Sequence, residues 1–378
     1  MDPSHTRLGA DTGRPDGILR GQNATETLGL NPDSGLYTKY YALSCKGIVS
    51  PAYAVFRPAS NEIFSKYLHY LTRSEIYVGL FGSWSYGVIP SRWRLYPEVF
   101  LKLPILLPPI KEQIAIAGFL DKKTSAIDNL IQKKQRQIEL LQEKRGALIT
   151  HAVTKGLNPD VRMKDSGVEW LGEVPEHWVV ERLKYLSSIN DESLPETTDP
   201  SFVFEYVDIG NVDTRYGIVK TEHYSFSEAP SRARRIVRPG DTIVSTVRTY
   251  LKAIAYIEKS KENVVVSTGF AVIRPKGIRP SFLSYALLSN FFIDNVVSRS
   301  EGISYPAISQ SQISNIVIPL PDNAEEQQSI ADFLDCKTAR IDALVDKINQ
   351  SISTLHEYRS ALITAAVTGK IDVRESVA

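Results

Sequence analysis

The chain has 378 residues, enough for two domains of ordinary size, and its 43% hydrophobic and 23% charged residues are typical of soluble globular proteins. The formal net charge of +1 excludes an argument for nucleic-acid binding from bulk charge, so a DNA-binding surface would need local clusters of lysine and arginine. No stretch approaches about 18 consecutive apolar residues, and the N-terminus has no apolar signal region, which argues against membrane insertion and secretion.

The first predicted elements are a globular domain over residues 1–110 and a long helix over residues 111–156. A proline-rich stretch ending at Pro109 marks the entry to the helix, and no proline interrupts the segment before Val153. Its apolar residues recur with a spacing of seven, which is typical of a coiled-coil helix. The residues predicted to pair with another helix are Leu120, Ile127, Leu141 and Leu148.

Residues 157–321 are interpreted as a second globular domain of α+β structure. Short runs of β-branched and aromatic residues predict strands of one mixed sheet. Apolar residues at core spacing predict one helix from Pro280 to Ser298, and a short turn follows at residues 309–313. The predicted strands cover residues 202–208, 242–247, 253–257, 264–267 and 270–274.

Residues 322–378 are interpreted as a second long helix with a tail, and this helix repeats the first one. From Glu112 onward each position has its counterpart 214 residues later, and roughly 24 of 44 positions are identical. The predicted pairing residues here are Leu334, Ile341, Ile348, Leu355 and Leu362. A weaker echo joins residues 53–58 to residues 270–275. The repeat predicts a pseudo-two-fold α+β chain in which two antiparallel helices hold two heads apart, although duplicated helices could also form no more than a core.

Basic and aromatic side chains cluster in the second domain just before and just after a predicted strand. Arginine and lysine beside tyrosine suit contacts with phosphates and base edges, although such a loop is more often a solvated surface. The candidate DNA-binding residues are Arg232, Arg234, Arg235, Arg238, Arg248, Tyr250 and Lys252. Charged residues on the outer faces of the long helices are either solvated or available for partner docking.

The motifs of the common catalytic chemistries are absent. The sequence contains no GxxxxGK[ST] phosphate loop, no GxGxxG turn after a strand, no HExxH metal pair and no nucleophile elbow. Cys45 and Cys336 lack the spacing of a structural zinc site, and so few cysteines fit a reducing cytoplasm. We therefore expect a cytoplasmic protein without catalytic residues, metal or other cofactor.

Several segments resemble one known family, the specificity (S) subunits of Type I restriction-modification systems. The resemblance covers residues 46–378 and rests on the segments 47–58, 108–113, 119–121, 166–178, 326–327 and 333–335. It implies two target-recognition domains that alternate with two long repeated helices. It further implies that each domain reads half of a bipartite site in double-stranded DNA, while the helices set the spacing and dock methylation (M) and restriction (R) subunits. Catalysis would then belong to those partners.

The chain departs from the family pattern at its N-terminus. A segment like residues 163–178 should recur about 214 residues earlier, so the first recognition domain is expected to be truncated by roughly fifty residues. This departure keeps a second hypothesis open, a degenerate coiled-coil adaptor without DNA readout. A third, an autonomous nuclease or methyltransferase, lacks a catalytic constellation.

Overall fold

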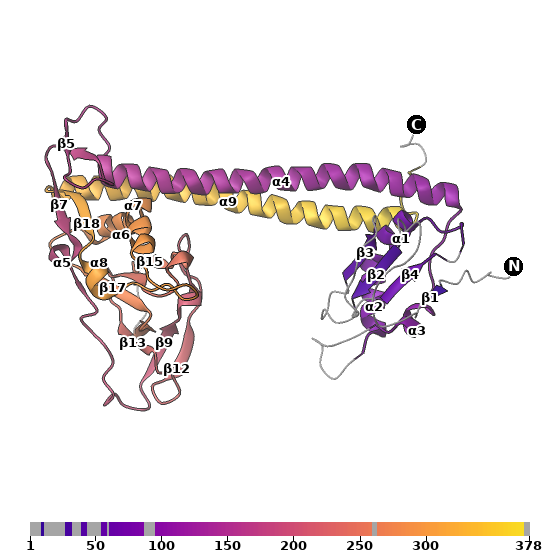
Figure 1. Cartoon of the computed structure of the whole chain (residues 1–378), viewed down its shortest axis with the longest axis horizontal. Helices are drawn as coiled ribbons and strands as arrows, with labels where there is room; N and C mark the ends of the chain where they lie inside the picture. The colour runs from indigo at the N-terminus through magenta and orange to yellow at the C-terminus, as the bar shows by residue number, and fades with distance from the viewer. Residues whose placement is uncertain are drawn as a thin grey trace. The chain divides into compact units, whose positions relative to one another are not determined.

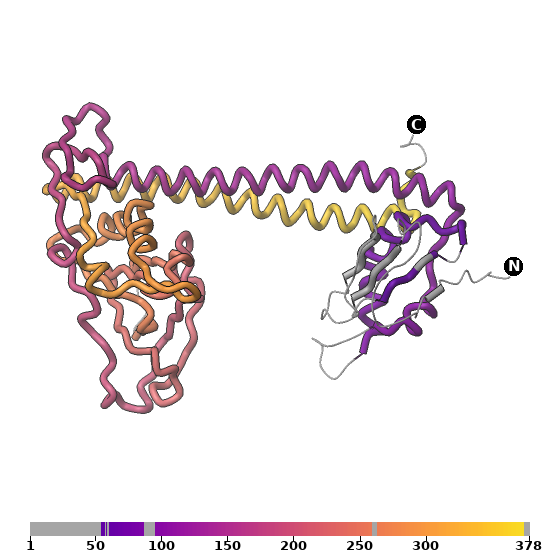
Figure 2. The backbone as a smooth tube through the Cα atoms, viewed as in Figure 1, coloured from indigo at the N-terminus to yellow at the C-terminus, as the bar shows by residue number. Residues whose placement is uncertain are grey.

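The computed structural model describes residues 54–58, 60–86, 95–258 and 263–373, together with the backbone of three short strands that precede them (Figure 2). It divides into two compact units. Unit 1 ends at Arg136 and resumes at Ile348, whereas unit 2 is continuous from Gln137 to Lys347. Each long helix therefore contributes one part to each unit. The predicted truncation concerns the stretch before Ala54, most of which lies outside the described residues.

The two predicted long helices are confirmed as α4 (Ile110–Lys155) and α9 (Ala324–Val367) (Figure 1). In each unit the start of one helix packs beside the end of the other, so that the pairing is antiparallel. The residues buried together are Ile116, Leu120, Ile363 and Ala366 in unit 1, and Ile149, Ala152, Ile330 and Leu334 in unit 2. Gly156 and Gly369 follow the two helix ends with φ angles of +77° and +71°, a conformation that glycine adopts readily.

Unit 1 combines a small sheet with three short helices. The antiparallel strands lie in the order β1–β4–β2–β3. They are β1 (Gly9–Ala10), β2 (Thr27–Asn31), β3 (Lys39–Leu43) and β4 (Ala54–Arg57), and the helices are α1 (Ser65–Thr72), α2 (Glu75–Trp84) and α3 (Pro97–Phe100). Phe56, Tyr67, Phe81 and Phe100 form the apolar core with the start of α4 and the end of α9.

Unit 2 contains two four-stranded sheets. One has the order β12–β9–β16–β13 and is mixed, because β9 and β16 run parallel; the other has the order β15–β14–β17–β8 and is antiparallel. The strands are β8 (Ser187–Ile189), β9 (Val203–Val207), β12 (Glu222–Ser225), β13 (Ala233–Ile236), β14 (Thr242–Ser245), β15 (Ile254–Tyr256), β16 (Val264–Ser267) and β17 (Phe270–Pro275). Val207, Ile243, Val266 and Val272 join the two sheets in one apolar cluster.

Three two-stranded pairings and short helices complete unit 2. The pairs are β5 (Met163–Asp165) with β6 (Glu173–Pro175), β7 (Trp178–Arg182) with β18 (Val317–Pro321), and β10 (Val212–Asp213) with β11 (Gly217–Ile218). The helices are α5 (Leu183–Leu186), α6 (Pro280–Leu288), α7 (Asn290–Ser298), α8 (Gln310–Ser314) and the 3₁₀ turns η2 (Ile209–Asn211) and η3 (Thr249–Leu251).

Two sequence predictions for unit 2 are wrong. The predicted strands do not form one sheet, since β9 and β16 lie in one sheet and β14, β15 and β17 in the other. Strands such as β14 and β16 are buried along their whole length, so their side-chain pattern carries no information on sheet membership. The predicted single helix is two, because Ser289 is extended (φ −68°, ψ 146°) and its hydroxyl accepts the Phe292 N–H as an N-cap.

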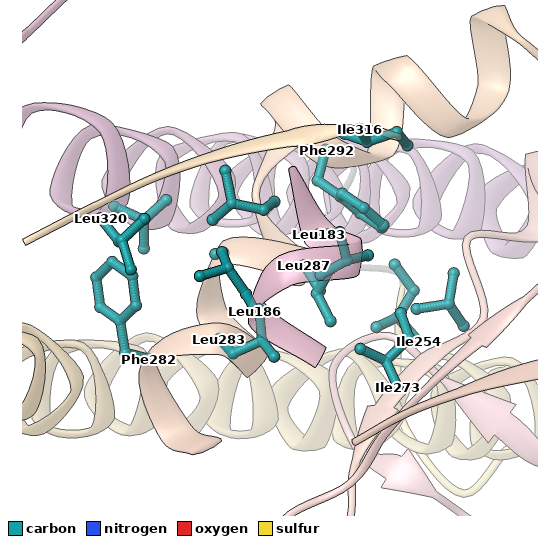
Figure 3. Close-up of a cluster of buried hydrophobic side chains, with 14 of the residues drawn as sticks. Leu183, Leu186, Ile254, Ile273, Phe282, Leu283, Leu287, Phe292, Ile316 and Leu320 are labelled. Carbon is teal, nitrogen blue, oxygen red and sulfur yellow. The ribbon is translucent and has the colours of Figure 1, made fainter. Parts of the chain in front are cut away.

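The largest core of unit 2 lies where the short helices meet the long ones. Figure 3 shows Leu183, Leu287 and Phe292 gathered in this cluster, with Phe282 nearby. Trp178 is fully buried in the same core, and its indole N–H donates to Glu326 Oε1 at 3.0 Å. Burial of these large apolar side chains stabilises the attachment of the head to α4 and α9.

Candidate nucleic-acid interface

The turn after β14 presents three of the predicted DNA-binding residues together. Arg248 and Lys252 both adopt left-handed backbone (φ +51° and +52°) on either side of η3. Such backbone is uncommon for residues other than glycine and is associated with functional sites. Both side chains are exposed, as is Tyr250, whereas Thr249 between them is buried. The turn therefore projects two cations and one aromatic ring into solvent.

Contacts from neighbouring segments hold this turn in place. Thr249 Oγ1 donates to Ser300 Oγ at 2.8 Å, and Thr214 Oγ1 donates to the carbonyl of Lys252. The Arg248 guanidinium lies over the ring of Tyr305, 4.9 Å from its centroid. The exposed side chains consequently stand on a fixed base, which lowers the entropic cost of ordering them on a ligand.

Three of the remaining candidates, on and beside β13, face the acidic segment 192–196. Arg238 lies 2.5 Å from Glu192 Oε1, and Arg234 lies 3.5 Å from Glu196 Oε1. Arg235 donates to Ser193 Oγ at 3.4 Å. The charges of Arg234 and Arg238 are therefore partly neutralised within the fold. Arg232 is exposed and has no ion pair with a described residue.

The structure thus separates the predicted basic residues into two groups. No described hydrogen bond or ion pair joins the side chains of the β13 group to those of the β14 turn. The loop of residues 300–307, which carries Tyr305, was not predicted. A glycine beside isoleucine and tyrosine between two helical segments is the signal that could have drawn attention to it.

The predicted helix-pairing residues differ in burial. Leu120, Ile127, Leu334 and Ile341 are buried, whereas Leu141, Leu148, Ile348, Leu355 and Leu362 are half-buried. Ile131 and Val345, four residues after Ile127 and Ile341, are also buried. Among the predicted pairing residues, the buried ones therefore lie in the first half of each helix, while other residues near the helix ends, such as Ile149 and Ile363, are buried as well.

Equivalent glutamines in the first turns of the long helices bind the two heads in the same way. Gln113 accepts the Phe64 N–H at 2.8 Å and donates to the Pro108 carbonyl at 2.8 Å. Gln327 accepts the Arg279 N–H at 2.9 Å and donates to the Pro321 carbonyl at 2.8 Å. Phe64 and Arg279 are the N-cap residues of α1 and α6. Each glutamine therefore pairs a backbone group left free at a helix start.

A further contact recurs in both units, about two turns further along each long helix. Tyr70 donates to Asp121 at 2.8 Å in unit 1, and Tyr285 donates to Asp335 at 2.5 Å in unit 2. Burial raises the pKa of Tyr70 to about 12, so its hydroxyl remains a donor at neutral pH. Burial also raises the pKa of Tyr285.

The ion pairs between the long helices are repeated, but unit 2 adds a contact from its head. Arg359 Nε lies 2.9 Å from Asp128 in unit 1, and Arg145 Nε lies 3.4 Å from Asp342 in unit 2. Asp342 also accepts from Arg215 Nε at 2.7 Å. Burial, the largest single influence, would lower the pKa of Arg215, but the hydrogen bond to Asp342 together with the charges of Asp342 and Asp346 outweighs it, and the pKa is raised.

Neither metal ligation nor membrane insertion is indicated in the part of the chain that the structure describes. Within that part, no three histidine, cysteine, aspartate or glutamate side chains converge as a metal-binding group. No described helix is long and apolar enough to cross a bilayer.

Residues 175–354 match the family model of the Type I restriction modification DNA specificity domain. The chain is 26% identical over 286 residues to the Type I restriction enzyme MjaVIII specificity subunit of Methanocaldococcus jannaschii, covering 73% of this chain and 64% of that subunit. It is 26% identical over 324 residues to the putative MjaX specificity subunit of the same organism, covering 85% and 71%.

A solved structure described as the basis of complex assembly and conformational transition of the type I R-M system has a similar fold. The TM-score is 0.62 at 19% sequence identity, and the match covers 91% of this chain and 82% of the other. This likeness extends the similarity in fold well beyond residues 175–354.

Proposed function

We propose that the chain is a Type I restriction-modification specificity subunit, since its residues 175–354 match the family model of that DNA specificity domain, and that it reads a bipartite DNA site for a Type I complex. Each recognition domain would read one half of the site, and the two long helices would set the spacing. We assign the first recognition domain to residues 1–110 and the second to 157–321. The helices, with the C-terminal tail, occupy 111–156 and 322–378.

The observation that carries this proposal is the β14 turn. Arg248 and Lys252 are exposed and have no ion-pair partner among the described residues, unlike Arg234 and Arg238. Free guanidinium and ammonium groups are suited to phosphates and guanine edges, and Tyr250 adds an exposed ring beside them. Since the chain is nearly neutral overall, this local charge is where an electrostatic attraction to DNA would arise.

The repeated helix surface supports docking of the same partner twice. Lys123 lies over the Phe119 ring and Lys337 over the Phe333 ring, 5.8 and 5.5 Å from the centroids. Leu130 and Leu344, at equivalent positions further along, are 43% and 51% exposed. Apolar side chains exposed at equivalent positions favour two copies of one partner, which we assign to the methylation subunit. Restriction subunits would join the assembly and, with the methylation subunits, supply the catalysis.

The test is to co-express the chain with its methylation subunit and to locate modified bases in the host DNA by single-molecule sequencing. We expect modification at a split motif with a fixed gap. Arg248→Ala combined with Lys252→Ala should abolish or relax the half of the motif read by this head, whereas Lys220→Ala, an exposed lysine already paired with Glu222, should leave the motif unchanged. Absence of any modified motif would favour the adaptor hypothesis.

A further inference from the structure

The loop of residues 300–307 is closed at its base and fixed to the β14 turn. Glu301 and Ala307 exchange two backbone hydrogen bonds of 2.9 Å, and Ala307 also forms a β-bridge with Val247. Ser300 Oγ donates to the Val296 carbonyl at 2.6 Å and contacts Thr249 Oγ1 at 2.8 Å. Because both ends are held, the residues between them form a narrow, anchored tip.

The tip presents apolar and aromatic surface to solvent. Ile303 is 103% exposed, which means that its side chain makes essentially no contact within the protein. Tyr305 is 65% exposed and carries the Arg248 guanidinium on its ring. Gly302 turns the chain with φ +111°, and a Cβ at this position would lie 3.0 Å from the Tyr305 carbonyl oxygen. The glycine therefore allows the turn that projects Ile303.

We propose that this tip enters a groove of the DNA and that Ile303 makes an apolar contact with a base pair there. The inference rests on the proposed function. Three observations point to DNA as the occupant: the cation Arg248 adjoins the tip and Lys252 lies on the same turn, Tyr305 carries the Arg248 guanidinium on its ring, and Ile303 projects without cover. Apolar side chains read thymine methyl groups or base steps, and a nearby arginine reads a base edge or a phosphate. Ile303 is thus a specificity-determining residue in addition to the predicted basic ones.

The inference predicts a loss that depends on DNA sequence. Ile303→Ala should weaken binding of the assembled complex to its own site about tenfold at fixed salt, within the usual effect of one lost base contact. Binding to a duplex without the site should not change. The slope of log K against log salt concentration should also stay the same, because an apolar contact releases no counterions.

The experiment uses the full chain assembled with its methylation subunit, and duplexes with and without the motif found by sequencing. Val203→Ala is the matched control, since Val203 is 57% exposed on a different sheet of the same head. In the host, Ile303→Ala should relax the motif at one base pair, and Val203→Ala should not.

Three results would overturn the inference while leaving the proposed function intact, provided that the wild-type complex modifies a split motif. One is an unchanged motif with unchanged affinities for both duplexes. Another is an equal loss on both duplexes. The third is poorer assembly with the methylation subunit while the motif stays the same, which would make the tip a protein-docking element.

Discussion

The junctions between head and long helix in the two units share their contacts but not their head sequences. Phe64 and Arg279 have unrelated side chains, yet the backbone N–H of each donates to the equivalent glutamine of the long helix. The first residues of α2 and α7 also share a contact, because Glu75 N–H donates to Thr364 and Asn290 N–H donates to Thr150. The repeated helices therefore bind backbone groups at helix starts, so that heads of different sequence can attach in the same way.

The units differ at the aspartate in the middle of each helix pair. Asp128 is bound by Arg359 alone among the described residues, whereas Asp342 binds Arg145 and also Arg215 from the head. A second difference lies inside the heads, where His69 in unit 1 occupies the place of the buried Ser284 in unit 2. Unit 2 therefore has an additional ion pair between its head and the long helix, and unit 1 has a partly buried histidine.

The largest loss of stability is expected when the glutamine that attaches each head to its long helix is replaced. Gln113→Ala and Gln327→Ala should each lower the free energy of unfolding by about 3 kcal/mol, since each leaves buried backbone groups unpaired and opens a cavity. Hydrogen exchange should increase in unit 1 for the first variant and in unit 2 for the second. Gln328→Ala, in the same turn but partly exposed, is the control and should have little effect. Faster exchange in unit 2 for Gln113→Ala, or in unit 1 for Gln327→Ala, would contradict the equivalence of the two junctions.

Replacing the aspartate in the middle of each helix pair should lower the stability of the two units by different amounts. Asp342→Asn should cost about 2 kcal/mol in a urea titration, because Arg215, whose side chain is 12% exposed, loses its nearest carboxylate. Asp128→Asn should cost at most about 1 kcal/mol, because the Asp128 side chain is 52% exposed. Equal losses would mean that the contact from the head adds no stability.

A smaller effect is expected at the paired tyrosines. Tyr70→Phe and Tyr285→Phe each remove one hydroxyl that donates to a helix aspartate, and each should cost about 1 kcal/mol. Thermal unfolding of both variants would check this value. A loss in one variant alone would show that the two junctions are not energetically equivalent.

The last effect depends on pH, is small at neutral pH, and should be confined to unit 1. Burial, followed by the charges of Arg73 and Arg359, lowers the pKa of His69 to about 4, while Asp121 opposes the shift. A histidine whose folded pKa is depressed contributes stability that is present above its unfolded pKa of about 6.5 and is lost as the pH falls towards 4. His69→Ser should therefore reduce the change in unfolding free energy between pH 7 and pH 5. An unchanged pH dependence in that variant would assign the effect to other groups.

Much of the fold could be predicted because its signals are local. The spacing of seven in the helices and the proline and glycine residues at their ends suffice to place α4 and α9. Sheet membership could not be predicted, because a fully buried strand such as β16 has no polar face to orient it. The break at Ser289 was missed because one serine within an apolar run is compatible with both a continuous helix and a cap.

The candidate site also has a part that local sequence predicts and a part that depends on the fold. Arg248, Tyr250 and Lys252 could be proposed because they follow a strand in the sequence. The pairing of Arg238 with Glu192 joins residues far apart in the chain, so a list of basic residues cannot distinguish a neutralised arginine from a free one. Ile303 was overlooked for a related reason, since full exposure of an apolar side chain is a property of the fold and not of the residue type.

The left-handed backbone at Arg248 makes the stability of the fold and the proposed recognition of DNA favour different residues at this position. Glycine adopts φ +51° without strain, so Arg248→Gly should relieve the backbone while it removes the guanidinium from the ring of Tyr305. Selection for heat resistance alone would favour that replacement, and, under the proposed function, selection for recognition of the DNA site would reject it. A library of variants at this one codon, sorted separately for thermal tolerance and for the modified motif, should rank its members in opposite orders.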